Sequence, residues 1–335
     1  MQKHLFASVC TLALLSVSTA AQAEHAHAKM PIGVMGAHVM PAGEWMASYR
    51  FDRTSQSDIR DGSSNVSFHD VLEQYGETPV DMRMNMHMLE GMVGVTPKLS
   101  LMAMAQYMEM DMVHEAHHSH HRHSMTEKGL GDTQISGVCQ LMHTMGEDSM
   151  QSVLLNAGAS LPTGSIDQDY ISHHGDLRHM SYAMQFGSGT VDPILGATYA
   201  GQQGEWNWGA QLLGTFRVYN NSNDYHLGNR YTANLWAGKQ LTDAVDASMR
   251  LEGVHWGDVS GADPMMPANS MAGATPALTG GEQVNAYFGL GLTPPIKALE
   301  GQRLALEFGA PVYQQFDGPL LETDYRLTLG WQIGF

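Results

Sequence analysis

The sequence predicts an all-β protein: a transmembrane, antiparallel, up-and-down β-barrel of about 12 strands with short periplasmic turns and long extracellular loops. Three observations predict this fold. Apolar and polar residues alternate with a period of two from residue 44 to the end. The connections between the alternating segments are in turn short and long, as in bacterial outer-membrane barrels. Only 15% of the 335 residues are charged, and no apolar run is long enough for a membrane-spanning helix.

The first 23 residues have the features of a signal peptide. Lys3 gives a basic start, an apolar run covers residues 5–17, and Ala21-Gln22-Ala23 has the small-x-small pattern of a cleavage site. We therefore expect residues 1–23 to be removed and the protein to be exported to the bacterial outer membrane. Cys139 is then the only thiol, so no intrachain disulfide forms.

Residues 24–43 form an irregular N-terminal segment. Glycine and proline interrupt the stretch 31–41 too often for regular structure. The segment is a candidate plug or latch at the periplasmic mouth of the barrel, and a loose tail is the alternative.

Residues 44–335 form the predicted barrel. The twelve alternating segments lie near 44–53, 81–93, 98–110, 129–142, 151–161, 190–200, 205–219, 229–240, 244–256, 282–293, 302–313 and 325–335. In each segment one face suits hydrocarbon and the other suits water. The predicted long connections include 54–80, 111–128 and 162–189. A barrel of this size leaves a narrow channel, between the filled interior of eight strands and the open pore of sixteen.

Charged residues on the polar faces favour a wet lumen over a dry core. Four of them are predicted to face the lumen: Arg250, Glu252, Arg303 and Glu307. Burying such groups inside the core of a soluble β-sandwich, which is the alternative fold, is costly. The last strand alternates up to a terminal Phe335, a pattern similar to the C-terminal signal read by the outer-membrane assembly machinery. Membrane lipid and that machinery are the expected partners.

Methionine is abundant, with 25 residues, and it follows two neighbouring segments. In the segment near 81–93 the polar-inside pattern predicts that Met82, Met84, Met86 and Met88 face lipid. In the segment near 98–110 it turns four methionines toward the lumen, and these form a candidate ladder for a soft ion such as Cu(I): Met102, Met104, Met108 and Met110. The alternative is that methionine fills an apolar lumen or eases passage of an apolar solute.

Histidine is concentrated in the loop predicted after these methionines. Its six members form a candidate site for Cu(II), Zn(II) or Ni(II), because closely spaced imidazoles chelate such ions without preformed geometry: His114, His117, His118, His120, His121 and His123. The sequence requires no cofactor. Binding of copper or another transition-metal ion stays an open alternative.

Composition excludes several other functions. A net charge of −17 argues against nucleic-acid binding, which needs basic patches. Ser188 lacks the strand, elbow and helix context of a hydrolase nucleophile, and no spacing selects a catalytic triad. We therefore do not expect an enzyme.

Several phrases resemble the outer-membrane transporter family named for the meta-pathway of phenol degradation. They are Gly129-Leu130-Gly131-Asp132, Leu161-Pro162-Thr163-Gly164, Gly187-Ser188-Gly189-Thr190-Val191-Asp192 and Leu327-Thr328-Leu329-Gly330-Trp331, in the family's order. The resemblance implies a β-barrel that moves small, often aromatic, compounds across the outer membrane, with no catalytic residues. The enrichment in methionine and histidine departs from the family pattern. Three functions follow as hypotheses: transport of a small solute, capture or movement of a metal such as copper, or a non-conducting structural barrel.

Overall fold

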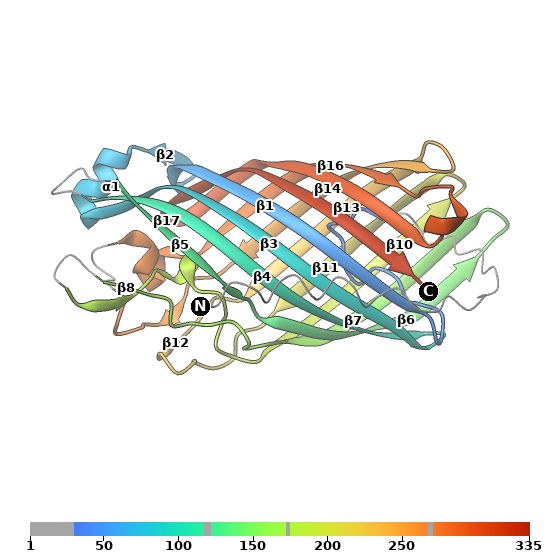
Figure 1. Cartoon of the computed structure of the whole chain (residues 1–335), viewed down its shortest axis with the longest axis horizontal. Helices are drawn as coiled ribbons and strands as arrows, with labels where there is room; N and C mark the ends of the chain where they lie inside the picture. Colours follow the sequence, from blue (N-terminus) through green and yellow to red (C-terminus); the bar gives the residue numbers. More distant parts are fainter. Residues whose placement is uncertain (1–29, 117–121, 172–174, 267–270) are drawn as a thin grey trace, which may run out of the picture.

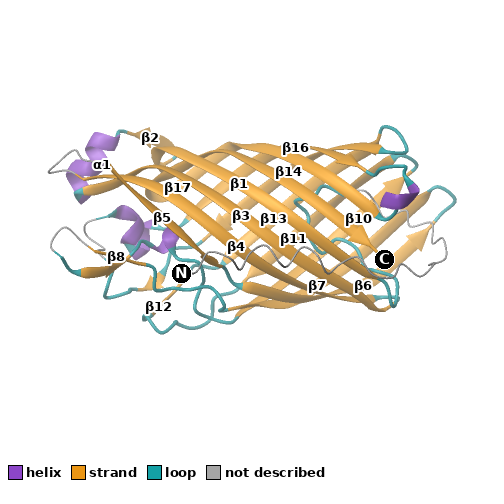
Figure 2. Cartoon of the chain, in the orientation of Figure 1, coloured by secondary structure: helices purple, strands orange, loops and turns teal. Residues whose placement is uncertain are grey.

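The computed structural model describes residues 30–116, 122–171, 175–266 and 271–335, and its elements are labelled in Figure 1. The predicted signal peptide lies outside these residues. Within them, β-strands dominate, as Figure 2 shows. The single α-helix of the described residues is α1 (Phe68–Tyr75). None of the helices in the described ranges is both long and apolar enough to span a membrane.

A closed antiparallel sheet forms the wall of the molecule. Its strands are β1 (Trp45–Gly62), β3 (Glu77–Thr96), β4 (Leu99–Ala116), β6 (Thr133–Met145), β7 (Ser149–Leu161), β10 (Asp192–Gln203), β11 (Trp206–Thr215), β13 (Arg230–Gln240), β14 (Val245–Trp256), β16 (Gly281–Leu292) and β17 (Gln302–Gly334). Each pairs with the next, and β17 pairs with β1 to close the barrel. Closure satisfies the backbone groups that lipid cannot.

The last element, β17, crosses the wall twice. Its first part, from Leu304 to Phe316, pairs with β16, and its second part, to Gly334, pairs with β1. The two parts lie side by side, because Trp331 Nε1 donates to Gln302 Oε1 over 3.0 Å near the open end of the hairpin. With ten other strands, the described wall has twelve passes, which confirms the predicted strand number.

The two ends of the barrel differ as predicted. Short turns join strands at the end where the C-terminus lies, and long connections extend from the other end (Figure 1). These connections contain short elements: β2 (Ser64–Val66), β8 (Asp169–Ile171), β9 (Leu177–His179), β12 (Tyr225–His226), β15 (Ser260–Gly261), η1 (Tyr182–Met184), η2 (Ala272–Ala274) and η3 (Pro276–Leu278). The short-turn end contains η4 (Lys297–Leu299).

The prediction of a long loop at 111–128 is wrong. Most of it is strand, because β4 continues to Ala116 and β5 (Arg122–Leu130) returns along it. β5 pairs with the outer half of β4, and β6 pairs with the inner half. The wall is therefore taller along β1, β3, β4 and β5 than along the strands that follow β6.

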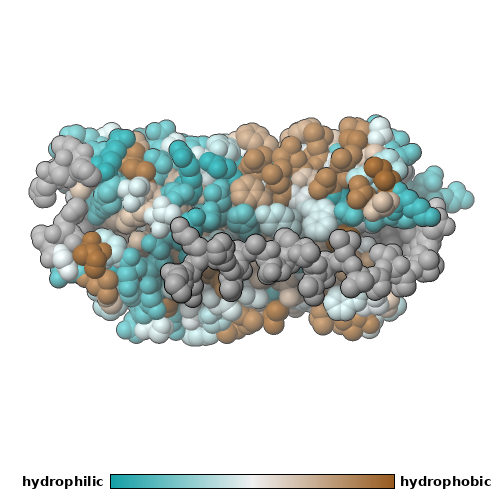
Figure 3. All heavy atoms as spheres, in the orientation of Figure 1, coloured by the Kyte–Doolittle hydropathy of each residue, from teal (hydrophilic) through white to brown (hydrophobic). Residues whose placement is uncertain are grey.

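The outer surface is apolar where lipid is expected. Leu304 and Phe308 are 48% and 51% exposed, whereas Glu307 between them in the alternation is 1% exposed. Leu329 and Trp331 of the last strand also point outward. Figure 3 shows apolar residues concentrated toward the end of the barrel that contains the C-terminus. The soluble sandwich is therefore excluded, since these side chains do not pack in a dry interior.

The orientation predicted for Met82 to Met88 is wrong. Met82 and Met88 are each 4% exposed and face the interior, whereas Leu89 is 64% exposed. The outward positions of this stretch carry polar side chains instead, and Arg83 among them is exposed. The polar-inside rule applies only where the outside is hydrocarbon.

Candidate functional site

The N-terminal segment, residues 30–43, lies inside the barrel as far as Pro41, whereas its Ala42 and Gly43 are exposed. Its backbone is bound by side chains from strands all around the wall. The contacts are Arg303 Nη1 to Met30 O (2.9 Å), Arg50 Nη1 to Ile32 O (3.3 Å), Gln211 Nε2 to Met35 O (2.8 Å), Asn156 Nδ2 to Gly36 O (2.8 Å) and Met40 N to Ser100 Oγ (2.8 Å). Since these partners lie on β17, β1, β11, β7 and β4, only a segment in the lumen can reach all of them.

Apolar side chains of the segment fill the space between these polar anchors. Met30, Val34 and Ala37 pack against Ala200 and Trp236 of the wall. Met40 packs in a second cluster with Met92, Val138 and Leu154. The segment is thus held by both hydrogen bonds and burial, and it occupies the half of the lumen nearer the short turns.

A charged network lines the wall beside this segment. Arg250 Nε and Nη2 donate to the two Glu307 carboxylate oxygens over 3.0 and 2.8 Å, and Arg250 Nη1 donates to Glu252 over 2.8 Å. The Arg250 guanidinium also lies 3.9 Å from the ring centroid of Tyr287. Gly33 of the segment sits directly on the pair, since a side chain there would collide with Arg250 and Glu307.

The fourth residue predicted for the lumen also points inward. Arg303 Nη2 lies 2.8 Å from Asp246 Oδ2 while Nη1 binds the Met30 carbonyl. All four predicted lumen residues thus face the interior, and Arg250, Glu252 and Glu307 form one network. Bidentate pairing fixes the geometry of such a network more strongly than single contacts do.

Methionines line the interior of β3 and β4 as two facing rows. The directly opposed pairs are Met82 and Met112, Met84 and Met110, Met86 and Met108, and Met92 and Met102. Met104 is opposite Glu90. The second row contains all four methionines of the predicted ladder, and the first row adds the methionines that the sequence placed in lipid.

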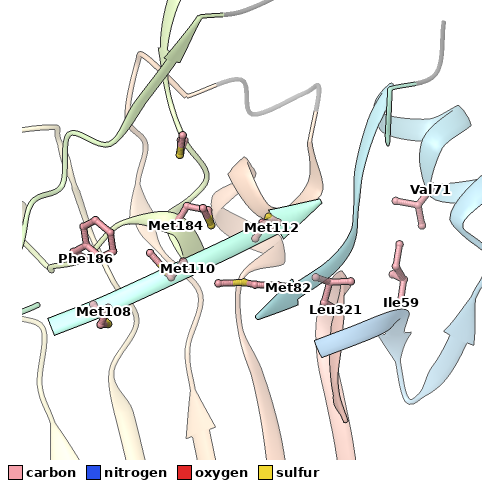
Figure 4. Packing of buried hydrophobic residues seen from close by; sticks show 10 residues of the cluster. Ile59, Val71, Met82, Met108, Met110, Met112, Met184, Phe186 and Leu321 are labelled. Atoms are coloured by element: carbon pink, nitrogen blue, oxygen red, sulfur yellow. The ribbon is translucent and has the colours of Figure 1, made fainter. Parts of the chain in front are cut away.

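The rows divide between two apolar clusters. Met108, Met110 and Met112 pack with Met82, Met184 and Phe186 in the cluster shown in Figure 4. Met102 instead packs against the cluster that contains Met40 of the N-terminal segment. The outer half of the interior therefore presents thioethers and an aromatic ring, a soft and adaptable apolar lining.

Residues from the first three family-like phrases gather in one buried polar cluster. Asp132 accepts from the Gly164 backbone N–H over 3.0 Å and from the Ser188 N–H over 2.8 Å. Ser188 Oγ lies 2.9 Å from Asp132 Oδ2 and 2.7 Å from Asp192 Oδ2. Arg217 pairs with Asp192. This cluster ties the connection between β7 and β10 to the junction of β5 and β6.

Replacing Asp132 by alanine should release that connection. The variant leaves two backbone N–H groups without their acceptor, at a cost of about 1–3 kcal/mol each if they stay buried. We expect trypsin to cleave residues 162–190 faster than in the wild type, with the barrel itself intact. Asp148→Ala, at an exposed position in a short turn, is the control. Equal cleavage rates for all three proteins would show that the cluster does not hold the connection.

Only two of the six predicted histidines lie in the described residues. His114 and His123 are on strands β4 and β5, not in a loop, and they are directly opposed. His117, His118, His120 and His121 lie outside the described residues. The structure adds Glu77, at the start of β3, whose Oε1 is 3.3 Å from His123 Nε2. Sequence reasoning missed Glu77 because only strand pairing brings it to the histidines.

Tyr170 of β8 lies over this end of the barrel. Burial, and next the negative charge of Glu77, raise the pKa of its phenol above the ordinary value. Its ring packs against the methionine cluster of Figure 4. The connection containing β8 therefore packs against the outer part of the methionine rows.

The closed, lipid-facing barrel with an occupied lumen defines the chain as an outer-membrane β-barrel. A family model described as "Putative MetA-pathway of phenol degradation" matches residues 77–294, and the chain belongs to this family. The matched range includes the Asp132, Ser188 and Asp192 cluster. No curated protein matches the sequence significantly.

Several solved outer-membrane structures are similar to this chain to different degrees. An outer membrane channel from Pseudomonas putida F1 is 13% identical, with a TM-score of 0.64 over 91% of this chain and 100% of that chain. The toluene transporter TodX from Pseudomonas putida is 8% identical, with a TM-score of 0.40 over 88% and 90% of the two chains. The translocator domain of the autotransporter NalP from Neisseria meningitidis is 8% identical, with a TM-score of 0.43 over 89% and 90%. At 13% identity, the likeness to the Pseudomonas putida F1 channel shows the fold alone.

Proposed function

We propose that this protein is a non-enzymatic outer-membrane channel for small apolar solutes of the aromatic type. Residues 1–23 are its proposed signal peptide, which directs export and is then removed. The paired methionine rows of β3 and β4 carry this proposal. Thioethers contact aromatic rings favourably and adapt to irregular shapes. A lining of this kind at the outer half of the lumen suits capture of an apolar ring better than passage of an ion.

The N-terminal segment is the proposed plug. It lies past the outer part of the methionine rows, formed by Met82, Met108, Met110 and Met112, on the path toward the short-turn end. A solute that enters from outside therefore meets this part of the rows first. The polar anchors of the segment are individually modest, because each net hydrogen bond contributes only about 0.5–1.5 kcal/mol. Local displacement of the segment would then open a narrow path without unfolding the wall.

Single-channel recording in a planar bilayer tests this function. We expect discrete conductance, and we expect phenol added on the outer side to block the current transiently. A Met108→Gln/Met110→Gln variant should shorten these blockages, because it replaces two inward thioethers by polar amides. Met145→Gln, at a position that is 74% exposed near a short turn, is the matched control.

The alternatives predict different recordings. A silent bilayer with correctly folded protein would favour a non-conducting structural barrel. Conductance with blockages that are the same in the Met108→Gln/Met110→Gln variant and the wild type would contradict the role of the methionine rows.

A further inference from the structure

Three metal-ligating side chains from three adjacent strands meet at the tall side of the barrel. Glu77 begins β3, His114 lies near the end of β4, and His123 lies near the start of β5. The potential ligand atoms of all three are within 4.8 Å of one another. The two imidazole rings have a centroid separation of 5.7 Å. Such separations allow one ion to reach all three groups after small rotations of the side chains.

The central ligand, His114, is buried and lacks a partner. Its side chain is 1% exposed, and neither ring nitrogen has a hydrogen-bond partner among the residues that the structure describes. Burying a polar group without a partner costs free energy, and native proteins rarely leave one so. A bound cation would supply the missing interaction for one of these nitrogens.

We propose that Glu77, His114 and His123 bind one divalent first-row transition-metal ion. Two imidazole nitrogens and one carboxylate oxygen form the ligand set that suits Zn²⁺ and Cu²⁺, and it leaves a fourth position for water or a further ligand. The site goes beyond the proposed transport of apolar solutes and does not depend on it.

The position of the site gives the ion a structural consequence. β5 pairs with β4 and with no other wall strand, so its second edge is unpaired in the described sheet. An ion held by His123, His114 and Glu77 would link the edge strand β5 to β4, with which it pairs, and to β3 beyond it. Metal binding should therefore stabilise β5 against local opening, because a ligand that binds only the closed form shifts the equilibrium toward it.

Calorimetric titration of the full-length protein in detergent with Zn²⁺ tests the site. The background variant carries His117→Asn, His118→Asn, His120→Asn and His121→Asn, so that the neighbouring histidines outside the site cannot chelate. We expect this background to bind one equivalent of Zn²⁺ and to show slower trypsin cleavage of β5 when Zn²⁺ is present. Adding His114→Asn should weaken binding by more than the roughly 10–100-fold that loss of an outer-shell partner costs.

Two further variants keep the test decisive. Glu77→Gln preserves size and hydrogen bonding, and it should also weaken Zn²⁺ binding. His143→Asn is the control, because His143 lies on β6, away from the site, with its Nδ1 2.9 Å from Ser152 Oγ of β7. This variant should leave Zn²⁺ binding unchanged. Heat-modifiable electrophoretic mobility checks that each barrel is folded. A folded background that binds no Zn²⁺, or equal affinity after His114→Asn or Glu77→Gln, would overturn the site.

Discussion

Replacing Gly33 by leucine should increase single-channel conductance several-fold. Gly33 sits on the Arg250 and Glu307 pair, and any side chain there would collide with both. These two groups cannot move aside easily, because Arg250 is also bound to Glu252 and stacked on Tyr287. The N-terminal segment must therefore leave its seat, and the lumen behind it opens. Recording from the purified variant in a planar bilayer measures the effect.

Ala42→Leu is the matched control for this experiment. It adds the same side chain to the same segment at an exposed position, so conductance should equal that of the wild type. A variant lacking residues 30–41 sets the upper limit, since it removes the contacts with Arg303, Asn156 and Gln211 together. If both Gly33→Leu and the deletion conduct like the wild type, the segment does not obstruct the path.

The orientation of side chains in the wall could be predicted from the sequence where one face of a strand contacts lipid and the other contacts the lumen. Along β14, β16 and β17 lipid lies outside and the lumen inside, so alternation alone places Leu304 outward and Glu307 inward. The same rule failed at Met82 to Met88, because that part of β3 has methionines inside and polar residues outside. It also missed that β4 and β5 continue through residues predicted as loop. Sequence alternation divides residues between two faces of a strand, but it does not by itself tell which face is inside.

The sites were less predictable, because their residues come from separate strands. The glycines and prolines of residues 31–41 indicate irregular structure. Arg303 and Gln211, however, bind backbone carbonyls, and since every residue has a carbonyl, the sequence cannot show which ones they bind. The histidine cluster pointed to metal chemistry, whereas Glu77 enters only through the register of β3 and β4. The family-like phrases contain Asp132 and Asp192, yet nothing in the sequence shows that Ser188 lies between them.

Glu307→Ala should lower the free energy of unfolding by about 3–5 kcal/mol, the cost of breaking a buried ion pair by removal of one partner. Glu307 is 1% exposed and accepts both bonds of the bidentate contact, so its loss leaves the buried Arg250 with only part of its compensation. Urea unfolding of protein refolded into lipid vesicles, followed by tryptophan fluorescence, measures the change.

The double variant Arg250→Met/Glu307→Leu separates the charge effect from a packing effect. Replacing a buried pair by apolar side chains of similar volume is often neutral or stabilising, so most of the lost stability should return. Such recovery would mean that the ion pair serves mainly to position the N-terminal segment, which contacts the pair at Gly33, and adds little to stability. A single variant that loses less than about 1 kcal/mol, the upper range for an exposed pair, would show instead that lumen water solvates Arg250 as well as Glu307 does.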